Sequence, residues 1–319
     1  MTNHAAMIPA IEAEHLQKAF KTARVLEDVS FSVPRGTVFA LLGSNGAGKT
    51  TTVNILTTLI KADGGSARVM GYDVGASPAM VRTQISLTGQ FAAVDPMLTG
   101  RENLELIAAL RHVPQARGTV ATLLGEFGLT DAAERRVMTY SGGMRRRLDI
   151  AMSLIGNPSV LFFDEPTTGL DPEARLDMWT RIRSLARSGT TVFLTTQLLD
   201  EADALADTVA ILHQGKIEAS GTPSALKRLV PGSNVLLGFA SADDRDTANR
   251  LLQVHHAVRP SDGLSLLVET DGKPSAIADI FLTLRDGNVE LAEFAQRNPT
   301  LDDVFFHIAG NGAGETAHA

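Results

Sequence analysis

Cysteine does not occur in this sequence of 319 residues, and its absence excludes disulfide scaffolds, thiolate metal sites and cysteine nucleophiles. The sequence also lacks any run of about 18 apolar residues, the length that a bilayer-spanning helix requires. Residues 1–10 lack the basic and then apolar pattern of a secretion signal. We therefore expect the protein to remain in the cytoplasm and to reach a membrane only through a partner.

A surplus of positive charge is also missing, because the formal net charge is −7. Nucleic-acid-binding proteins normally present a broad basic surface, so the sequence predicts no nucleic-acid partner. Hydrophobic residues make up 44% of the chain, which is enough to bury a sizeable core. The length is suited to two globular domains.

Short apolar runs alternate with helical patterns up to about residue 225, as in βαβ units around a largely parallel sheet. The fold class is therefore predicted to be α/β. Two stretches, Ile11–Phe20 and Val29–Val33, alternate apolar and polar residues and predict antiparallel strands at the side of this sheet. The main strands are expected at Val38–Leu42, Val160–Phe163, Val192–Thr195 and Val209–Leu212.

Glycine and proline at residues 221–223 and 231–233 indicate a domain boundary. We place a first domain at residues 1–225, a small α+β accessory domain at 226–310 and a disordered tail at 311–319. In the accessory domain the sequence predicts strands at 234–239, 264–268 and 289–294, and helices at 244–252, 276–284 and 301–309.

A glycine-rich loop follows the apolar strand Val38–Leu42 and precedes a helical pattern over Thr51–Ile60. Its glycines let backbone N–H groups surround phosphate oxygens, and the helix N-terminus adds a favourable dipole. Lys49 can bridge the β- and γ-phosphates of a nucleotide, and the hydroxyl of Thr50 can hold Mg²⁺. The pattern predicts a nucleotide phosphate site without naming the class of ATPase or GTPase. It comprises Gly43, Ser44, Asn45, Gly46, Ala47, Gly48, Lys49 and Thr50.

Two acidic residues, Asp164 and Glu165, end the apolar strand that begins at Val160. A carboxylate at such a strand end organises Mg²⁺ in phosphoryl-transfer sites, which is the role predicted for Asp164. Glu165 can orient an attacking water molecule or accept its proton. Taken alone, the pair would be an ordinary acidic strand end; beside a phosphate loop, the functional interpretation is favoured.

A second anion-binding helix start is predicted at Ser141-Gly142-Gly143, where Ser141 has the character of an N-cap. The two glycines leave backbone N–H groups open before a helix expected at Met144–Ile155. A simple surface cap is the alternative for this motif on its own.

The order and identity of these motifs resemble the ATP-binding subunit of an ABC transporter over roughly the first 225 residues. The resemblance implies a P-loop NTPase sheet with an antiparallel side sheet and a helical subdomain at about residues 91–157. It also implies ATP and Mg²⁺ as cofactors and a homodimer of nucleotide-binding subunits. In such a dimer Ser141, Gly142 and Gly143 of one subunit close over the γ-phosphate bound by the other.

The same resemblance assigns further residues. Phe20 stands where the family has an aromatic that stacks on adenine, and Thr51 joins the nucleotide-binding loop. Asp171 matches the carboxylate of a loop that crosses the dimer interface, and Gln90 matches a glutamine that senses Mg²⁺ and the attacking water. The implied Mg²⁺ ligands are Thr50, Gln90 and Asp164, and the implied catalytic residues are Lys49, Gln90, Glu165 and Gln197.

Gln197 and Met144 depart from the family pattern, which usually has histidine and glutamine at these positions. Glutamine can donate a hydrogen bond but cannot carry charge or shuttle a proton. Thr195-Thr196-Gln197 and the segment 301–305 resemble the daunorubicin/doxorubicin-resistance branch of drug-export ATPases. That branch implies export of a drug or antibiotic-like molecule through a separate transmembrane permease subunit, which would hold this chain at the cytoplasmic face of the membrane.

Other interpretations stay open at this point. A non-transport ABC ATPase of translation would carry two phosphate loops, and one of DNA repair would carry a long coiled coil between Lys49 and Asp164; neither is present in the sequence. A nucleotide-dependent regulator that scarcely hydrolyses ATP is a further alternative, because of Gln197. The amphipathic stretch Leu104–Leu110 is predicted either to pack in the core or to grip the membrane partner. The run Arg145–Arg147 is interpreted as a solvated face or as partners of nearby acids.

Overall fold

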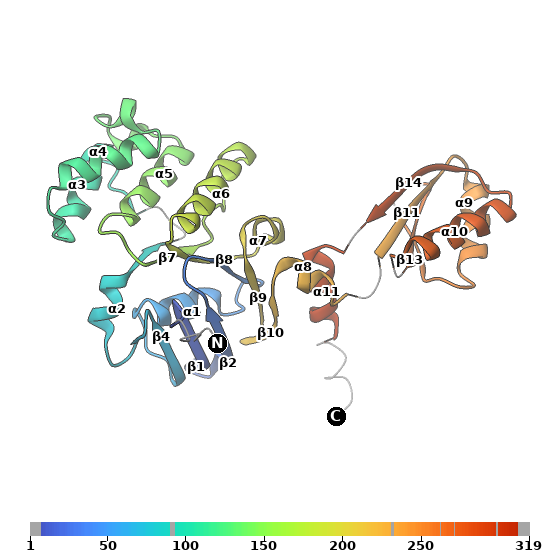
Figure 1. The fold of residues 1–319 in the computed structure, drawn as a ribbon, viewed down its shortest axis with the longest axis horizontal. Helices are drawn as coiled ribbons and strands as arrows, with labels where there is room; N and C mark the ends of the chain where they lie inside the picture. Colours follow the sequence, from blue (N-terminus) through green and yellow to red (C-terminus); the bar gives the residue numbers. More distant parts are fainter. Residues whose placement is uncertain are drawn as a thin grey trace, which may run out of the picture. The chain divides into compact units, whose positions relative to one another are not determined.

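The computed structural model describes residues 8–89, 93–230, 233–261, 263–270, 272–297 and 299–311 (Figure 1). The chain forms two compact units, Met1–Pro223 and Ser224–Ala319.

One mixed sheet dominates the described part of the first unit. Strands β9, β3, β8, β7 and β6 run parallel to one another and reach one edge of the sheet at β6, whereas β10 is antiparallel to β9 and pairs with β2 on its other side. Strands β1, β2, β4 and β5 form the antiparallel side of the sheet. The spatial order is β5 (Tyr72–Asp73), β4 (Gly64–Val69), β1 (Ile11–Phe20), β2 (Ala23–Val33), β10 (Lys216–Gly221), β9 (Thr208–His213), β3 (Val38–Leu42), β8 (Thr191–Thr196), β7 (Val160–Asp164) and β6 (Ile85–Thr88).

The centre of this sheet is covered on both faces, since every residue of β3, β7 and β8 is buried. Phe39 and Phe193 stack with ring centroids 5.3 Å apart, and Phe31 and Phe162 pack against Phe193. The predicted α/β sheet with an antiparallel side is therefore present. The apolar runs without alternation have the pattern expected of strands buried on both faces.

The helices of the first unit fall into two groups. In Figure 1, α3, α4 and α5 lie together at one end of the unit, and contacts join each of the three to the other two. The remaining helices accompany the sheet. The bounds are α1 (Lys49–Leu56), α2 (Pro78–Gln84), α3 (Gly100–Leu110), α4 (Ala116–Glu126), α5 (Gly142–Ser153), α6 (Pro172–Arg187) and α7 (Leu199–Leu205), with short 3₁₀ turns at Thr130–Ala132 and Val137–Thr139. Helix α8 (Pro223–Lys227) begins at the last residue of the first unit and otherwise belongs to the second.

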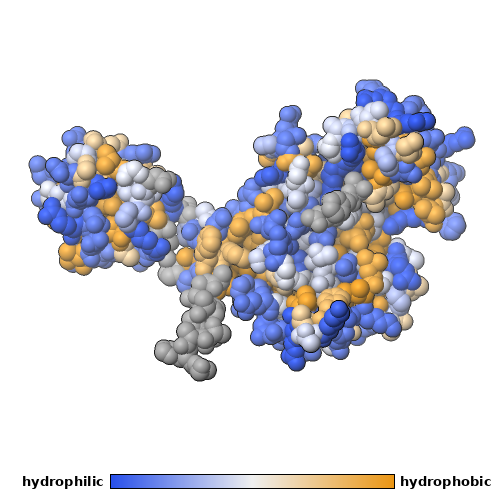
Figure 2. All heavy atoms as spheres, turned by 180° about the vertical axis from the view of Figure 1, so that it is seen from behind, coloured by the Kyte–Doolittle hydropathy of each residue, from blue (hydrophilic) through white to orange (hydrophobic). Residues whose placement is uncertain are grey.

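Helix α3 divides the stretch Leu104–Leu110 between a buried face and an exposed face. Leu104 and Ala108 are fully buried, whereas Leu106 and Leu110 are exposed. Hydrophobic surface is visible on the helical end of this unit in Figure 2. One face of α3 thus belongs to the core, and the other leaves leucine side chains in contact with solvent.

The second unit has the chain order β-α-β-β-α-β, known as a split βαβ arrangement. Its strands have the order β12-β13-β11-β14, and every neighbouring pair is antiparallel. Val235, Leu237, Val268 and Ile280 belong to a hydrophobic core within this unit. The elements are β11 (Ser233–Phe239), α9 (Ala242–Leu252), β12 (Val258–Pro260), β13 (Ser265–Thr270), α10 (Pro274–Asp286), β14 (Leu291–Arg297) and α11 (Leu301–Asn311).

The predicted α+β elements are present, and Thr300 and Asp303 exchange side-chain to backbone hydrogen bonds, as expected for a capping pair. The short strand β12 escaped prediction because it has three residues, two of them exposed. In the described residues of the whole chain, no helix combines the length and the apolar character that crossing a membrane needs.

Candidate nucleotide site

The predicted phosphate-binding residues gather at the carboxyl ends of β3 and β7. Ligands of open α/β sheets bind in this place, outside the carboxyl ends of parallel strands. A cavity of about 530 Å³ opens there. The antiparallel side of the sheet contributes Phe20, at the end of β1, and Val25, in β2. The lining of this cavity consists of Phe20, Val25, Ser44, Asn45, Gly46, Gly48, Lys49, Thr50, Thr51, Asp164 and Glu165.

The loop between β3 and α1 depends on glycine at defined points. Gly48, directly before α1, has φ +111°, and a Cβ atom there would lie 2.5 Å from Cδ2 of Leu26. A Cβ at Gly43 would lie 2.5 Å from the carbonyl oxygen of Leu212. Gly46 has φ +81° but no atom within 4 Å of its ideal Cβ position. Close packing therefore requires glycine at Gly43 and Gly48. At Gly46 there is space for a side chain, and only the left-handed backbone favours glycine.

Lys49 begins α1 and is only 5% exposed. Its Nζ donates hydrogen bonds to the carbonyl oxygens of Gly43, at 2.8 Å, and Ser44, at 3.2 Å. The same nitrogen lies 3.4 Å from Oε1 of Glu165. The loop therefore carries a buried ammonium group beside the acid that ends β7, and such a group can bind phosphate oxygens as a point charge.

Asp164 is tied to two hydroxyl groups. Thr50 donates to Oδ2 of Asp164 at 3.1 Å, and Thr195, on the neighbouring strand β8, donates to Oδ1 at 2.5 Å. Thr50 and Asp164 thus present a hydroxyl and a carboxylate side by side, and both are oxygen ligands that Mg²⁺ prefers. Sequence reasoning missed Thr195, because its contact with Asp164 exists only through the pairing of β7 with β8.

The backbone of Glu165 is left-handed, with φ +51°, which is uncommon for a residue other than glycine. Its N–H donates to the carbonyl oxygen and to Oγ1 of Thr195, at 3.2 and 3.1 Å. Oε2 accepts a hydrogen bond from Thr168 at 3.3 Å. These contacts turn the chain sharply after β7, so that adjacent carboxylates make different contacts: Asp164 with Thr50, and Glu165 with Lys49.

A second cavity, of about 700 Å³, brings together the other two predicted motifs. Ser141 caps α5 by accepting a hydrogen bond from the N–H of Met144, and Asp171 caps α6 by accepting one from Ala174. Gly142 and Gly143 line this cavity with them. The two cavities share no lining residue in the described parts of the chain. Ser141 and Asp171 therefore do not line the phosphate cavity of their own chain.

Comparison with known proteins places this geometry in a family. The profile of the family described as ABC transporter matches residues 26–168. The daunorubicin resistance ATP-binding protein DrrA2 of Streptomyces coeruleorubidus is 45% identical over 96% of this chain and 97% of its own length. The daunorubicin/doxorubicin resistance ATP-binding protein DrrA of Streptomyces peucetius is 45% identical over 96% of this chain and 94% of its own. The chain belongs to the ABC transporter family.

Its fold agrees with that assignment. A solved structure of an ATP-binding subunit of an ABC transporter has a TM-score of 0.63 and 31% identity, and the match covers 69% of this chain and 92% of that one. The predicted family, its drug-resistance branch and the ABC ATPase fold are thereby confirmed. As a member of this family, the chain is an ATP-binding ATPase subunit.

The outcome differs among three further residues that the resemblance assigned to the ABC site. Phe20 lies at the cavity, 48% exposed, with Nζ of Lys18 5.4 Å from its ring centroid. Gln197 directly follows β8 and is exposed, and it is not among the residues that line the phosphate cavity. Gln90 lies outside the described residues.

A buried group of charged residues adjoins this ABC site and escaped sequence reasoning. Arg146 and Asp149 of α5 form an ion pair at 3.1 Å. Burial lowers the pKa of Arg146 and raises the pKa of Asp149, and the charge of each opposes the shift of the other. The run Arg145–Arg147 is thus not one solvated face, because its middle residue is buried and paired with an acid.

Glu201, on α7, is the second buried acid near the site. Its Oε1 accepts hydrogen bonds from Thr167 at 2.7 Å and from Trp179 at 3.3 Å. Burial raises the pKa of Glu201. Trp179, which lies on a helical pattern typical of core residues, is only partly buried and serves as a donor to this acid.

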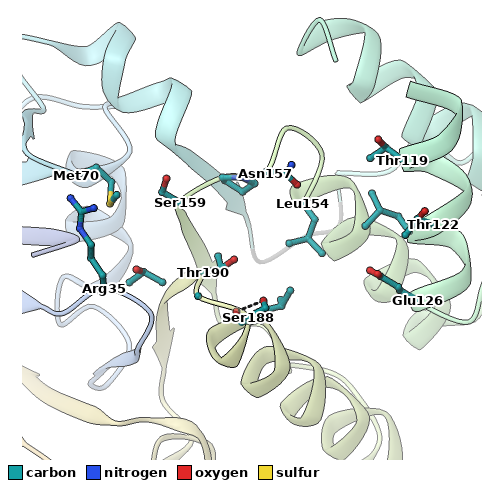
Figure 3. A pocket seen from close by; sticks show the side chains of 15 residues that line it. Arg35, Met70, Thr119, Thr122, Glu126, Leu154, Asn157, Ser159, Ser188 and Thr190 are labelled. Carbon is teal, nitrogen blue, oxygen red and sulfur yellow. Dashed lines mark hydrogen bonds between the residues drawn. The ribbon is translucent and has the colours of Figure 1, made fainter. Parts of the chain in front are cut away.

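A third cavity, of about 730 Å³, lies elsewhere in the ABC fold (Figure 3). It is lined by the loops that precede β7 and β8, so it adjoins the amino ends of these strands, opposite to the phosphate loop. Figure 3 shows Arg35 and Met70 on one side of it and Thr119, Thr122 and Glu126 of α4 on the other. Its charged lining residues face one another across the space and do not converge on a common point.

Proposed function

We propose that this chain is the ATP-hydrolysing motor subunit of an exporter. Two copies bind ATP together with Mg²⁺, and their closure and hydrolysis drive a separate transmembrane permease subunit between its facing states. The observation that carries the proposal is the convergence of Lys49, Thr50, Asp164 and Glu165 on one cavity at the carboxyl ends of β3 and β7.

Each of these residues has a defined task in hydrolysis. The N–H groups at the start of α1 and the ammonium of Lys49 bind the β- and γ-phosphates. Thr50 and Asp164 would hold Mg²⁺, which would neutralise phosphate charge. Glu165 orients the attacking water molecule and accepts its proton. Phe20, half-exposed at the rim of the cavity, stacks on the adenine ring.

The shared site of a homodimer follows from the separation of the two cavities. Ser141, Gly142 and Gly143 lie at the N-terminus of α5, where backbone N–H groups and the helix dipole favour an anion. Because they do not line the phosphate cavity of their own chain, we propose that they meet the γ-phosphate held by a second copy. The loop that carries Asp171 would lie at the same interface between the two copies.

Gln197 replaces the usual histidine of this family, so hydrolysis rests chiefly on Glu165. The exposed side chain of Gln197 stands next to β8, and it can donate a hydrogen bond to phosphate but cannot shuttle a proton. We propose that Gln90 completes the site as a sensor of Mg²⁺ and of the attacking water.

A drug or antibiotic-like molecule is the proposed cargo, because the relatives with 45% identity over nearly the whole chain are named for resistance to daunorubicin and doxorubicin. The exposed Leu106 and Leu110 of α3 are the proposed contact for the membrane subunit. Such a contact would hold the chain at the cytoplasmic face of the membrane.

ATP turnover by the wild-type chain, compared with Glu165→Gln, tests the motor. Glutamine keeps the size of Glu165 but cannot accept a proton, so we expect turnover to fall by a factor of roughly 10² to 10⁴. ATP affinity, measured in parallel by equilibrium titration, should change by less than about threefold, because the phosphate contacts of Lys49 remain. Equal background turnover in both proteins would contradict the motor and favour a regulator that binds ATP without hydrolysing it.

A further inference from the structure

One guanidinium group connects α5, the helix that begins at Ser141-Gly142-Gly143, with two strand ends at the nucleotide site. Nε of Arg146 donates to the carbonyl oxygen of Pro166 at 2.9 Å, and Nη1 donates to that of Gly89 at 2.8 Å. Pro166 directly follows Glu165 in the chain, and Gly89 directly follows β6. Arg146 itself lies in the second turn of α5, whose N-cap is Ser141.

Asp149 completes this arrangement from the next turn of α5. Its Oδ2 accepts from Nη1 of Arg146 at 3.1 Å, and its Oδ1 accepts from the backbone N–H of Ala93 at 3.1 Å. The side chains of Arg146 and Asp149 are only 7% and 5% exposed. The pair therefore holds Gly89 and Ala93, on the two sides of Gln90 in the sequence, as well as the residue after Glu165.

The chemistry of the contacts requires arginine in particular. A planar guanidinium can donate in several fixed directions at once, here to two carbonyl groups and a carboxylate, whereas a lysine ammonium is a compact point charge on a flexible stem. Burial excludes water that could replace a lost donor, so the Pro166 and Gly89 carbonyl groups would lose their partner when the guanidinium is removed.

We propose that Arg146, held in place by Asp149, is a positioning residue for ATP hydrolysis. It fixes the carbonyl group next to Glu165 and the end of β6 relative to the helix that carries Ser141, Gly142 and Gly143. The Ser141–Gly143 motif and Glu165 of one chain thus keep a fixed position relative to each other when two copies close. This inference rests on the proposed function, because it assigns Arg146 to the same hydrolytic site.

Arg111 offers a matched control. This half-buried arginine, at the end of α3, donates to the carbonyl oxygen of Ile85 and to Oγ of Ser86, at the amino end of β6. It joins the same helical group to the same strand as Arg146 does, but at the end that faces away from the phosphate loop. A merely structural anchor should behave alike at both positions.

The decisive measurement is steady-state ATP turnover together with equilibrium ATP binding for Arg146→Gln, Arg146→Lys and Arg111→Gln. For Arg146→Gln we expect kcat to fall by about tenfold or more, with ATP affinity within about twofold, because Arg146 does not line the phosphate cavity. Arg146→Lys should recover part of the rate, and Arg111→Gln should keep kcat within about twofold. Equal losses in Arg146→Gln and Arg111→Gln, or a loss of affinity instead of kcat, would overturn the proposal.

Folding is checked by circular dichroism at rising temperature. If Arg146→Gln does not fold, Asp149→Asn replaces it, because asparagine keeps an oxygen acceptor for Ala93 but removes the charge that holds the guanidinium. We expect kcat of Asp149→Asn to fall by about threefold to tenfold, again at unchanged ATP affinity; an unchanged kcat in a folded Asp149→Asn counts against the pair.

A readout without turnover separates this inference from the proposed function. Hydrogen–deuterium exchange at the amide of Ala93 should accelerate by about tenfold in Arg146→Gln and remain unchanged in Arg111→Gln. If the wild type does not hydrolyse ATP, the proposed motor function is wrong, but the exchange difference at Ala93 still tests the role of Arg146 and Asp149. If exchange at Ala93 is unchanged in Arg146→Gln, the positioning role of Arg146 and Asp149 is contradicted even when the wild type hydrolyses ATP.

Discussion

Nζ of Lys49 lies 3.4 Å from Oε1 of Glu165, so the cation of the phosphate loop and the acid after β7 form a contact in which both side chains are at most 10% exposed. The lysine also donates to two carbonyl groups of its own loop. The cation proposed to bind phosphate, at the first residue of α1, and the acid proposed to activate water, directly after β7, are therefore in contact with each other.

Lys49→Met should weaken ATP binding by at least about tenfold, because methionine has no charge to offer the β- and γ-phosphates. Isothermal titration with ATP checks this. Lys216→Met is the control, since its Nζ forms an exposed pair with Glu27 and such pairs contribute little. A loss of affinity of similar size in both variants would contradict the assignment.

Gly48→Ala and Gly46→Ala should differ in stability. A methyl group at Gly48 would lie 2.5 Å from Leu26 and 3.0 Å from the carbonyl oxygen of Val25, whereas Gly46 has open space around it. We expect Gly46→Ala to cost only the left-handed backbone, about 1–2 kcal/mol, and Gly48→Ala to cost clearly more. Urea unfolding without nucleotide measures both, and equal costs would show that the close contact with Leu26 relaxes freely.

Thr195→Val should lower both stability and turnover. The buried hydroxyl donates to Asp164 and accepts from the N–H of Glu165, so its removal takes one hydrogen bond away from each of these two groups. The expected loss is about 1–3 kcal/mol in the free energy of unfolding, with a higher Mg²⁺ concentration needed for half-maximal turnover. Thr195→Ser restores the hydroxyl and should recover both quantities. If serine fails to do so, the methyl group of Thr195 matters rather than its hydroxyl.

Glu201 should make stability depend on pH. Burial raises the pKa of Glu201 above its ordinary value of 4.5, so the folded state binds a proton more tightly than the unfolded state. Stability from this group is therefore present below pH 4.5 and is lost as pH rises through the folded-state pKa. The charges that act around it include Asp200 beside it and Arg146 on α5.

Glu201→Gln removes this dependence, because glutamine cannot ionise but keeps an oxygen acceptor for Thr167 and Trp179. The free energy of unfolding of Glu201→Gln, relative to that of the wild type, should increase as pH rises above 4.5. This difference should become constant once pH exceeds the folded-state pKa of Glu201. Urea unfolding at a series of pH values measures the difference. Parallel curves for wild type and Glu201→Gln would rule out a buried titration at this position.

Local patterns in the sequence predicted much of the site because its principal parts are contiguous. The phosphate loop, Asp164–Glu165 and the N-cap Ser141 each combine their chemistry with their own strand end or helix start. Thr300 and Asp303, three residues apart, are predictable for the same reason.

The sequence by itself determined the nucleotide chemistry, the α/β sheet and the family, since these depend on residue types at short, fixed spacings. Only the tertiary structure decided that Lys49 contacts Glu165, that Thr195 holds Asp164, and that Arg146 is buried against Asp149 and Pro166. The physical reason is that strand pairing and helix packing bring together residues distant in the chain. A run such as Arg145–Arg147 looks uniform until packing buries its middle residue and leaves Arg145 in solvent.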